Sequence, residues 1–148
     1  MTSPEPFVHT AAFADLDVTT LYALLRLRVD VFVVEQACAY PELDGRDTEP
    51  SARHCWIEDD HGPAAALRIL HEPDGTVRIG RVVTAPRARH QGLAATLIRH
   101  AVAVTAPDPV VLGAQRYLED WYRSFGFEVD GPAYVEDGIP HVPMRLRR

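Results

Sequence analysis

Near Pro86 the spacing of apolar residues in this chain changes from the pattern of strands to that of a helix. Before that point, three apolar runs at residues 54–58, 64–70 and 76–84 are separated by turn residues, as in a meander of hairpins. After it, apolar residues recur at helical spacing: Leu93, Leu97, Ala101 and Val104. The order predicts a sheet with at least one long helix packed on it.

The segments on either side complete this arrangement. Residues 7–12 read as a first strand, and Thr19 or Thr20 caps a predicted helix that runs to about Phe32. Residues 36–53 read as a loop, and 110–114 as a fully apolar strand of the kind found inside a sheet. A short helix over 118–125 and one or two closing strands follow, so the fold class is α/β with a mixed sheet.

Length, charge and cysteine content restrict the class of protein. The 148 residues are expected to form a single domain, 1–148. The formal charge of −6 argues against a nucleic-acid partner, and no apolar run is long enough to cross a membrane. Residues 1–13 lack the pattern of a secretory signal, and Cys38 and Cys55 make no disulfide framework, so a cytoplasmic location is expected.

One segment, residues 80–94, carries the pattern of an anion site. A strand ends at Thr84, a loop with Arg87 and Arg89 follows, and a helix is predicted to begin near Gln91. The first turn of a helix has about four backbone N–H groups without partners and a partial positive charge. Gly92 lets an anion approach the backbone, so this segment suits a pyrophosphate.

Two motifs then resemble a known superfamily. The dinucleotide and nucleotide-triphosphate glycine patterns are missing, which makes a nucleotide-binding domain improbable. Arg89-x-x-Gly92-x-Ala94 instead resembles the acetyl-CoA signature of the GNAT N-acetyltransferases. Residues 115–127 resemble a second segment of that superfamily, with Gln115 where Asn is usual and Leu118 where Ala is usual. The segments around residues 33–36, 112–115 and 136–141 resemble its ElaA-like subgroup.

The resemblance implies a GNAT fold with a sheet of six or seven strands and about four helices. Two parallel strands, 76–84 and 110–114, would splay into a V that holds the pantetheine arm of acetyl-CoA, with no metal ion. The implied cofactor-binding residues are Val82, Val83, Thr84, Arg89, His90, Gln91, Gly92, Leu93, Ala94, Ala95 and Gln115.

The resemblance also implies catalytic roles. Tyr122 is the matched general acid for the CoA thiolate, and Glu35 and His141 are both candidates for the general base. Each has a simpler interpretation: a core aromatic, a solvated carboxylate and a loop hydrogen bond. A metal site at His54, Cys55 and their neighbours fits no usual zinc spacing.

The resemblance implies transfer of an acetyl group from acetyl-CoA to a primary amine, by direct attack in a ternary complex. The alternative is a non-catalytic acyl-CoA-binding or regulatory module. The acceptor is expected to be a small-molecule or peptide amine, and the chain a possible homodimer. Acidic residues in predicted loops suit a cationic amine or simply a solvated surface: Glu35, Asp44, Asp47, Glu136 and Asp137.

Overall fold

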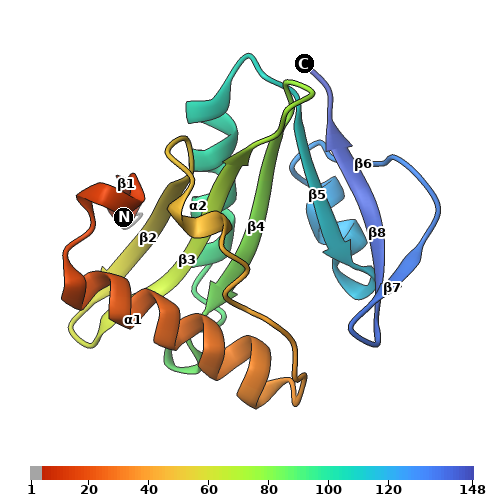
Figure 1. The fold of residues 1–148 in the computed structure, drawn as a ribbon. Coiled ribbons are helices and arrows are strands. Elements are labelled where there is room, and N and C mark those ends of the chain that lie inside the picture. Colours follow the sequence, from red (N-terminus) through yellow and green to blue (C-terminus); the bar gives the residue numbers. More distant parts are fainter. Residues whose placement is uncertain (1–4) are drawn as a thin grey trace, which may run out of the picture.

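The computed structural model describes residues 5–148. Of the segment 1–13, for which the sequence predicts no secretory signal, residues 1–4 therefore lie outside the described part. Among residues 5–148, eight strands form one mixed sheet in the order β1-β2-β3-β4-β5-β8-β6, with β7 paired to β8 (Figure 1). The strands are β1 (His9–Ala11), β2 (Arg53–Asp59), β3 (Gly62–His71), β4 (Val77–Thr84), β5 (Val110–Gln115), β6 (Glu128–Val129), β7 (Tyr134–Glu136) and β8 (Ile139–Leu146). The three α-helices are α1 (Val18–Val29), α2 (Leu93–Thr105) and α3 (Glu119–Arg123).

The predicted mixed sheet is confirmed, while the numbers of elements differ from those predicted. The tail forms three strands instead of one or two, because the turn at Asp137-Gly138 pairs β7 with β8 and β6 pairs farther along β8. The last helix is shorter than predicted: it begins at Glu119, after a 3₁₀ turn over residues 116–118, and ends at Arg123. No helix among the described residues has the length and apolar content to cross a membrane.

The cap of helix α1 lies two or three residues earlier than the sequence predicted. Asp17, and not Thr19 or Thr20, is the N-cap, and its carboxylate accepts a hydrogen bond from the Thr20 amide at 2.7 Å. The helix continues into a π-helical segment, Asp30–Glu35, that carries Glu35 to its end. The alternating residues 26–31 are therefore helical, as predicted.

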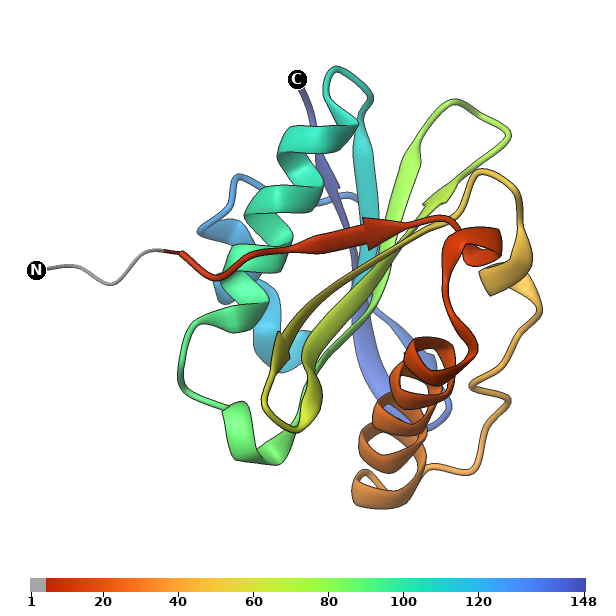
Figure 2. The same cartoon turned by 90° about the vertical axis from the view of Figure 1, so that its left-hand side faces the viewer.

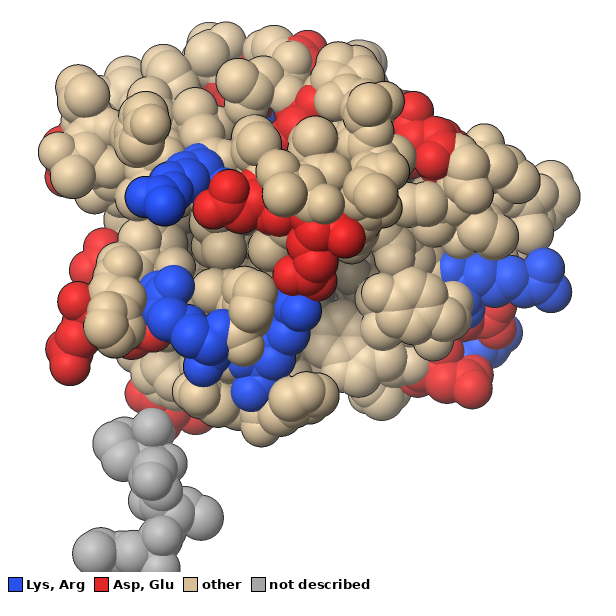
Figure 3. All heavy atoms as spheres, turned by 90° about the horizontal axis from the view of Figure 1, so that it is seen from below, with Lys and Arg blue, Asp and Glu red and all other residues tan. Residues whose placement is uncertain are grey.

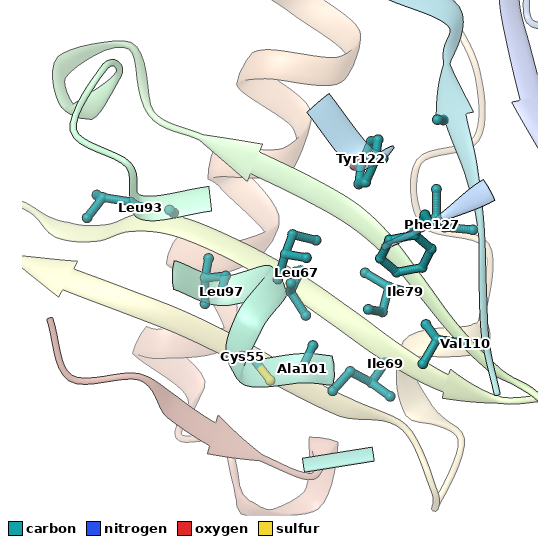
Figure 4. Packing of buried hydrophobic residues seen from close by; sticks show 14 of the residues in the cluster. Cys55, Leu67, Ile69, Ile79, Leu93, Leu97, Ala101, Val110, Tyr122 and Phe127 are labelled. Carbon is teal, nitrogen blue, oxygen red and sulfur yellow. The ribbon is translucent and has the colours of Figure 1, made fainter. Parts of the chain in front are cut away.

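The sheet lies between α1 on one face and α2 with α3 on the other (Figure 2). On the α2 face, Leu97 and Ala101 are fully buried beside Leu67 and Ile69 of β3 (Figure 4). Val104 is 54% exposed, so its predicted place on the buried face is wrong. The buried stripe of α2 follows residues four apart, so that the next buried position after Ala101 is Thr105. The Thr105 hydroxyl donates a hydrogen bond to the Ala101 carbonyl.

Candidate active site

Strands β4 and β5 run parallel but separate soon after they begin. They pair only at Val77 with Val110 and at Arg78 with Val111. Farther along, β4 pairs only with β3, and β5 pairs only with β8, in the described chain. The facing edges of the two strands therefore leave backbone N–H and C=O groups open to a ligand that has amides of its own.

A cleft of about 1140 Å³ occupies this gap and continues to the start of α2. Figure 3 looks at this end of the molecule and shows basic and acidic side chains gathered side by side near a hollow. The predicted site residues that line the cleft are Glu35, Val82, Val83, Thr84, Arg89, His90, Gly92, Leu93, Ala94, Ala95, Gln115, Tyr122 and His141. Gln91 does not line it, because the residue is exposed just outside the helix.

The N-terminus of α2 opens into the cleft without a side-chain cap. The helix begins at Leu93, two residues later than predicted, because His90 and Gly92 take left-handed conformations with φ of 67° and 74°. Glycine adopts that conformation at no steric cost. No side chain in the described chain accepts hydrogen bonds from the first helical amides, which leaves them available to an anion.

The two loop arginines have different surroundings. Arg89 lines the cleft, and its two terminal nitrogens each lie 2.9 Å from an oxygen of Glu35. Arg87 instead binds Asp59, at 2.9 and 3.0 Å, and does not line the cleft. Of the two loop arginines, Arg89 alone therefore lies where its charge could meet a phosphate in the cleft.

Tyr122 lies at the inner wall of the cleft and is 6% exposed. Its ring packs edge-on against Trp121 and Phe127. The hydroxyl has no hydrogen-bond partner among residues 5–148. Burial, with a smaller effect of Tyr117, raises the pKa of Tyr122 to about 12. The phenol therefore stays protonated at neutral pH and can donate a hydrogen bond into the cleft.

His141 has a fixed orientation in β8. Its Nδ1 lies 2.7 Å from the Ile139 carbonyl, and its ring stacks on Tyr134 at 5.5 Å. Because a carbonyl oxygen only accepts, Nδ1 must donate, and in the neutral ring the lone pair is then on Nε2. Glu35, the other candidate base, is held by both terminal nitrogens of Arg89.

The sequence analysis missed a buried charge cluster beside the cleft. Arg28 of α1 is 3% exposed and binds Glu42 at 2.7 Å and Asp47 at 2.7 Å. Arg68 of β3 is 5% exposed and binds Asp44 at 2.6 Å and Asp47 at 3.2 Å. The loop of residues 36–53 is thus fastened to the sheet by paired charges.

Two of the acidic residues considered for a cationic amine belong to this cluster and are already paired. Burial opposes ionisation of Asp47, but its contacts with Arg28 and Arg68 together outweigh burial and lower its pKa. Contact with Arg68 is the main reason that the pKa of Asp44 is lowered. Glu136 and Asp137, by contrast, line the cleft and form no ion pair within the described residues.

A sequence signal for this cluster exists in α1. Leu24, Leu27 and Val31 are buried at helical spacing, and Arg28 falls on the same face. An arginine on a buried face needs carboxylate partners. The nearest acidic residues, however, lie in a loop whose path the sequence does not specify.

An open slot between two parallel strands, next to an uncapped helix N-terminus, defines a site for an extended ligand with a phosphate group. Comparison with known proteins gives the family. The family model described as Acetyltransferase (GNAT) domain matches residues 26–148, and the chain belongs to this family.

Relatives are similar over most of the chain. A UPF0039 protein of Mycobacterium tuberculosis is 48% identical over 134 residues, 88% of this chain and 86% of that protein. Protein ElaA of Escherichia coli is 42% identical over 139 residues, 88% of this chain and 90% of ElaA. An acyl-CoA N-acyltransferase structure from Pseudomonas aeruginosa has a TM-score of 0.90 at 40% identity, over 95% of this chain and 99% of that one. The fold and the ElaA-like resemblance are thereby confirmed, and the fold supports acyl-CoA acyltransferase activity.

Proposed function

We propose that this protein transfers an acetyl group from acetyl-CoA to a primary amine, with both substrates bound together. The observation that carries the proposal is the gap between β4 and β5, which begins after Arg78 and Val111 and lies beside the uncapped start of α2. A pantetheine arm has two amides for the open strand edges, and a pyrophosphate suits the free amides of a helix N-terminus.

The residues of the chain would divide the work along the cleft. Main-chain groups of Val82, Val83 and Thr84 would pair with the pantetheine, and amides near Gly92 would hold the pyrophosphate with Arg89. The thioester supplies an activated acyl group. Because the site holds both substrates side by side, attack by the amine needs positioning and proton handling, not a covalent enzyme intermediate.

His141 is the better supported base. Its Nε2 lone pair is free in the tautomer that the Ile139 carbonyl selects, whereas both oxygens of Glu35 are engaged by Arg89. An amine that reaches the cleft as an ammonium ion must lose a proton before it attacks. We therefore assign proton removal to His141. The role of Glu35 is to pair with Arg89.

Tyr122 would stabilise the departing thiolate by donating a hydrogen bond. Its pKa of about 12 lies above that of an ordinary thiol, about 8.5. Full proton transfer to the thiolate would therefore be unfavourable. Donation without transfer involves no such cost and still favours developing negative charge.

The alternative is an acyl-CoA-binding module without turnover. Gln115 and Leu118, which depart from the superfamily pattern, both line the cleft at its β5 end.

Glu136 and Asp137 support a cationic amine, small or peptidic, as acceptor. A cytoplasmic location and a homodimer remain predictions.

Release of free CoA thiol from acetyl-CoA in the presence of a panel of amines tests the proposal. We expect one or more cationic amines to stimulate release in the wild type, and Tyr122→Phe to lower kcat with little change in CoA affinity. Saturable acetyl-CoA binding without release for any amine would support the binding-module alternative. Unchanged kcat in Tyr122→Phe would remove Tyr122 from the reaction.

A further inference from the structure

Arg81 has an unusual backbone for a strand residue. Its φ of 53° lies in the left-handed region, which residues with a Cβ rarely adopt. It sits in a bulge, because Ala66 pairs with Val83 and Arg68 pairs with Gly80, so that Arg81 and Val82 stand opposite Leu67 alone. Bulges bend a strand and increase its twist.

The side chain of Arg81 is held in several directions. Its Nε donates to Glu42 Oε2 at 2.6 Å, and its Nη2 donates to the Glu42 carbonyl at 3.1 Å. Asp44 Oδ2 lies 3.4 Å from the same nitrogen. The guanidinium also lies over the ring of Tyr40, 5.7 Å from its centroid.

Glu42, the main partner, is itself fixed by the rest of the fold. It is 3% exposed and accepts hydrogen bonds from Arg28 of α1 at 2.7 Å and from the Tyr40 hydroxyl. Arg81 is thus tied through Glu42 to helix α1. A strained backbone persists where its surroundings hold it in place, and this cluster provides that support.

The bulge lies in the wall of the cleft, which Arg81 itself also lines. The parallel pairing of β4 with β5 ends at Arg78, and the bulge follows three residues later. Val82 and Val83, directly after Arg81, line the cleft with the main-chain groups assigned to acyl-CoA. We propose that Arg81, clamped by Glu42, is a positioning residue that maintains this bulge and so orients the Val82 and Val83 backbone toward acyl-CoA. The inference rests on the proposed function.

The test compares Arg81→Gly, Arg81→Ala and Arg81→Lys. CoA affinity is measured by calorimetry on folded protein well below its melting temperature, where stability alone does not change the dissociation constant. Arg81→Ala loses the hydrogen bonds to Glu42 but keeps a Cβ, and with it the free-energy cost of the left-handed backbone. We therefore expect about tenfold weaker CoA binding. Arg81→Gly removes that cost, so its affinity is expected to exceed that of Arg81→Ala by about fivefold.

The lysine variant separates geometry from charge. Lysine keeps the charge and the Cβ but lacks the fork that binds both the carboxylate and the carbonyl of Glu42. We expect the lysine variant to bind CoA more weakly than Arg81→Gly. The comparison of these two variants is sufficient for the test if Arg81→Ala does not fold. Arg145→Ala is the matched control, because Arg145 is a similarly half-buried strand arginine paired with Asp130 outside the cleft. Its CoA affinity should equal that of the wild type.

Equal affinity in the alanine and glycine variants, or a lysine variant that binds better than the glycine variant, would overturn the proposal. A second measurement is independent of the ligand. The amide NMR signals of Val82–Thr84 should move in Arg81→Ala and less in Arg81→Gly, and unmoved signals would also refute the clamp. A wild type that binds no CoA would defeat the proposed function, while the amide signals would still report on the bulge.

Discussion

Replacing Arg28 with alanine would leave two buried carboxylates short of a cation. Glu42 and Asp47 are 3% and 7% exposed, and Arg28 bonds to both at 2.7 Å. Neither would be wholly unpaired, since Arg81 still contacts Glu42 and Arg68 still contacts Asp47. Three carboxylates with Asp44 would nevertheless share two guanidinium groups, and two of the three, Glu42 and Asp47, are buried.

The magnitude follows from this geometry. Removing one partner of a buried ion pair costs about 3–5 kcal/mol, and the remaining arginines place this case near the lower end. A loss of about 3 kcal/mol would lower the melting temperature by roughly 6–12 °C for a domain of this size. Such a loss is a large fraction of the 5–15 kcal/mol that is typical of a domain.

Urea unfolding at neutral pH measures the effect, with Arg123→Ala as control. Arg123 pairs with Glu119 one turn away on the surface of α3, and exposed pairs contribute about 0.3–0.5 kcal/mol. The account expects a small change for Arg123→Ala and a large one for Arg28→Ala with an unchanged slope. A loss below about 1 kcal/mol for Arg28→Ala would show that the carboxylates are not confined as described.

Three further predictions concern the cleft and its support. Arg89→Glu should weaken acetyl-CoA binding in a calorimetric titration by about tenfold or more, whereas Glu35→Gln frees Arg89 and should leave binding equal or tighter. Burial lowers the pKa of His54, so the unfolded chain binds more protons below about pH 6.5. Stability should therefore fall as the pH drops below that value, and His54→Gln should reduce this slope in urea unfolding. A Cβ at Gly113 would lie 2.3 Å from the Tyr134 hydroxyl, so Gly113→Ala should displace that ring and raise the KM of the amine, while unchanged kinetics would contradict the placement of Tyr134.

Most of the sheet and the loop that leads into α2 could be predicted because their signals are local. The change of period at Pro86, the apolar run of β5 and the turn at Asp137-Gly138 each depend on a few adjacent residues. The start of α2 was placed two residues early because a left-handed His90 is not visible in sequence. Local pattern therefore placed the start of α2 to within a turn.

The features that remained hidden are long-range. Arg28 meets Glu42 and Asp47 across 14 and 19 residues of chain, and Arg81 meets Glu42 across 39. The spacing of charges in a loop carries no information about which side chains meet, because the path of the loop decides it. The pairing of Arg89 with Glu35, two candidates for different roles, was unpredictable for the same reason.

Calorimetric titration of the purified protein with acetyl-CoA, with NAD and ATP as controls, tests the central claim most directly. The account predicts saturable one-site binding of acetyl-CoA and none of the controls, because the slot between β4 and β5 suits a pantetheine arm that they lack. A folded sample that binds no acetyl-CoA, or that binds NAD or ATP equally well, would contradict the assignment of this cleft.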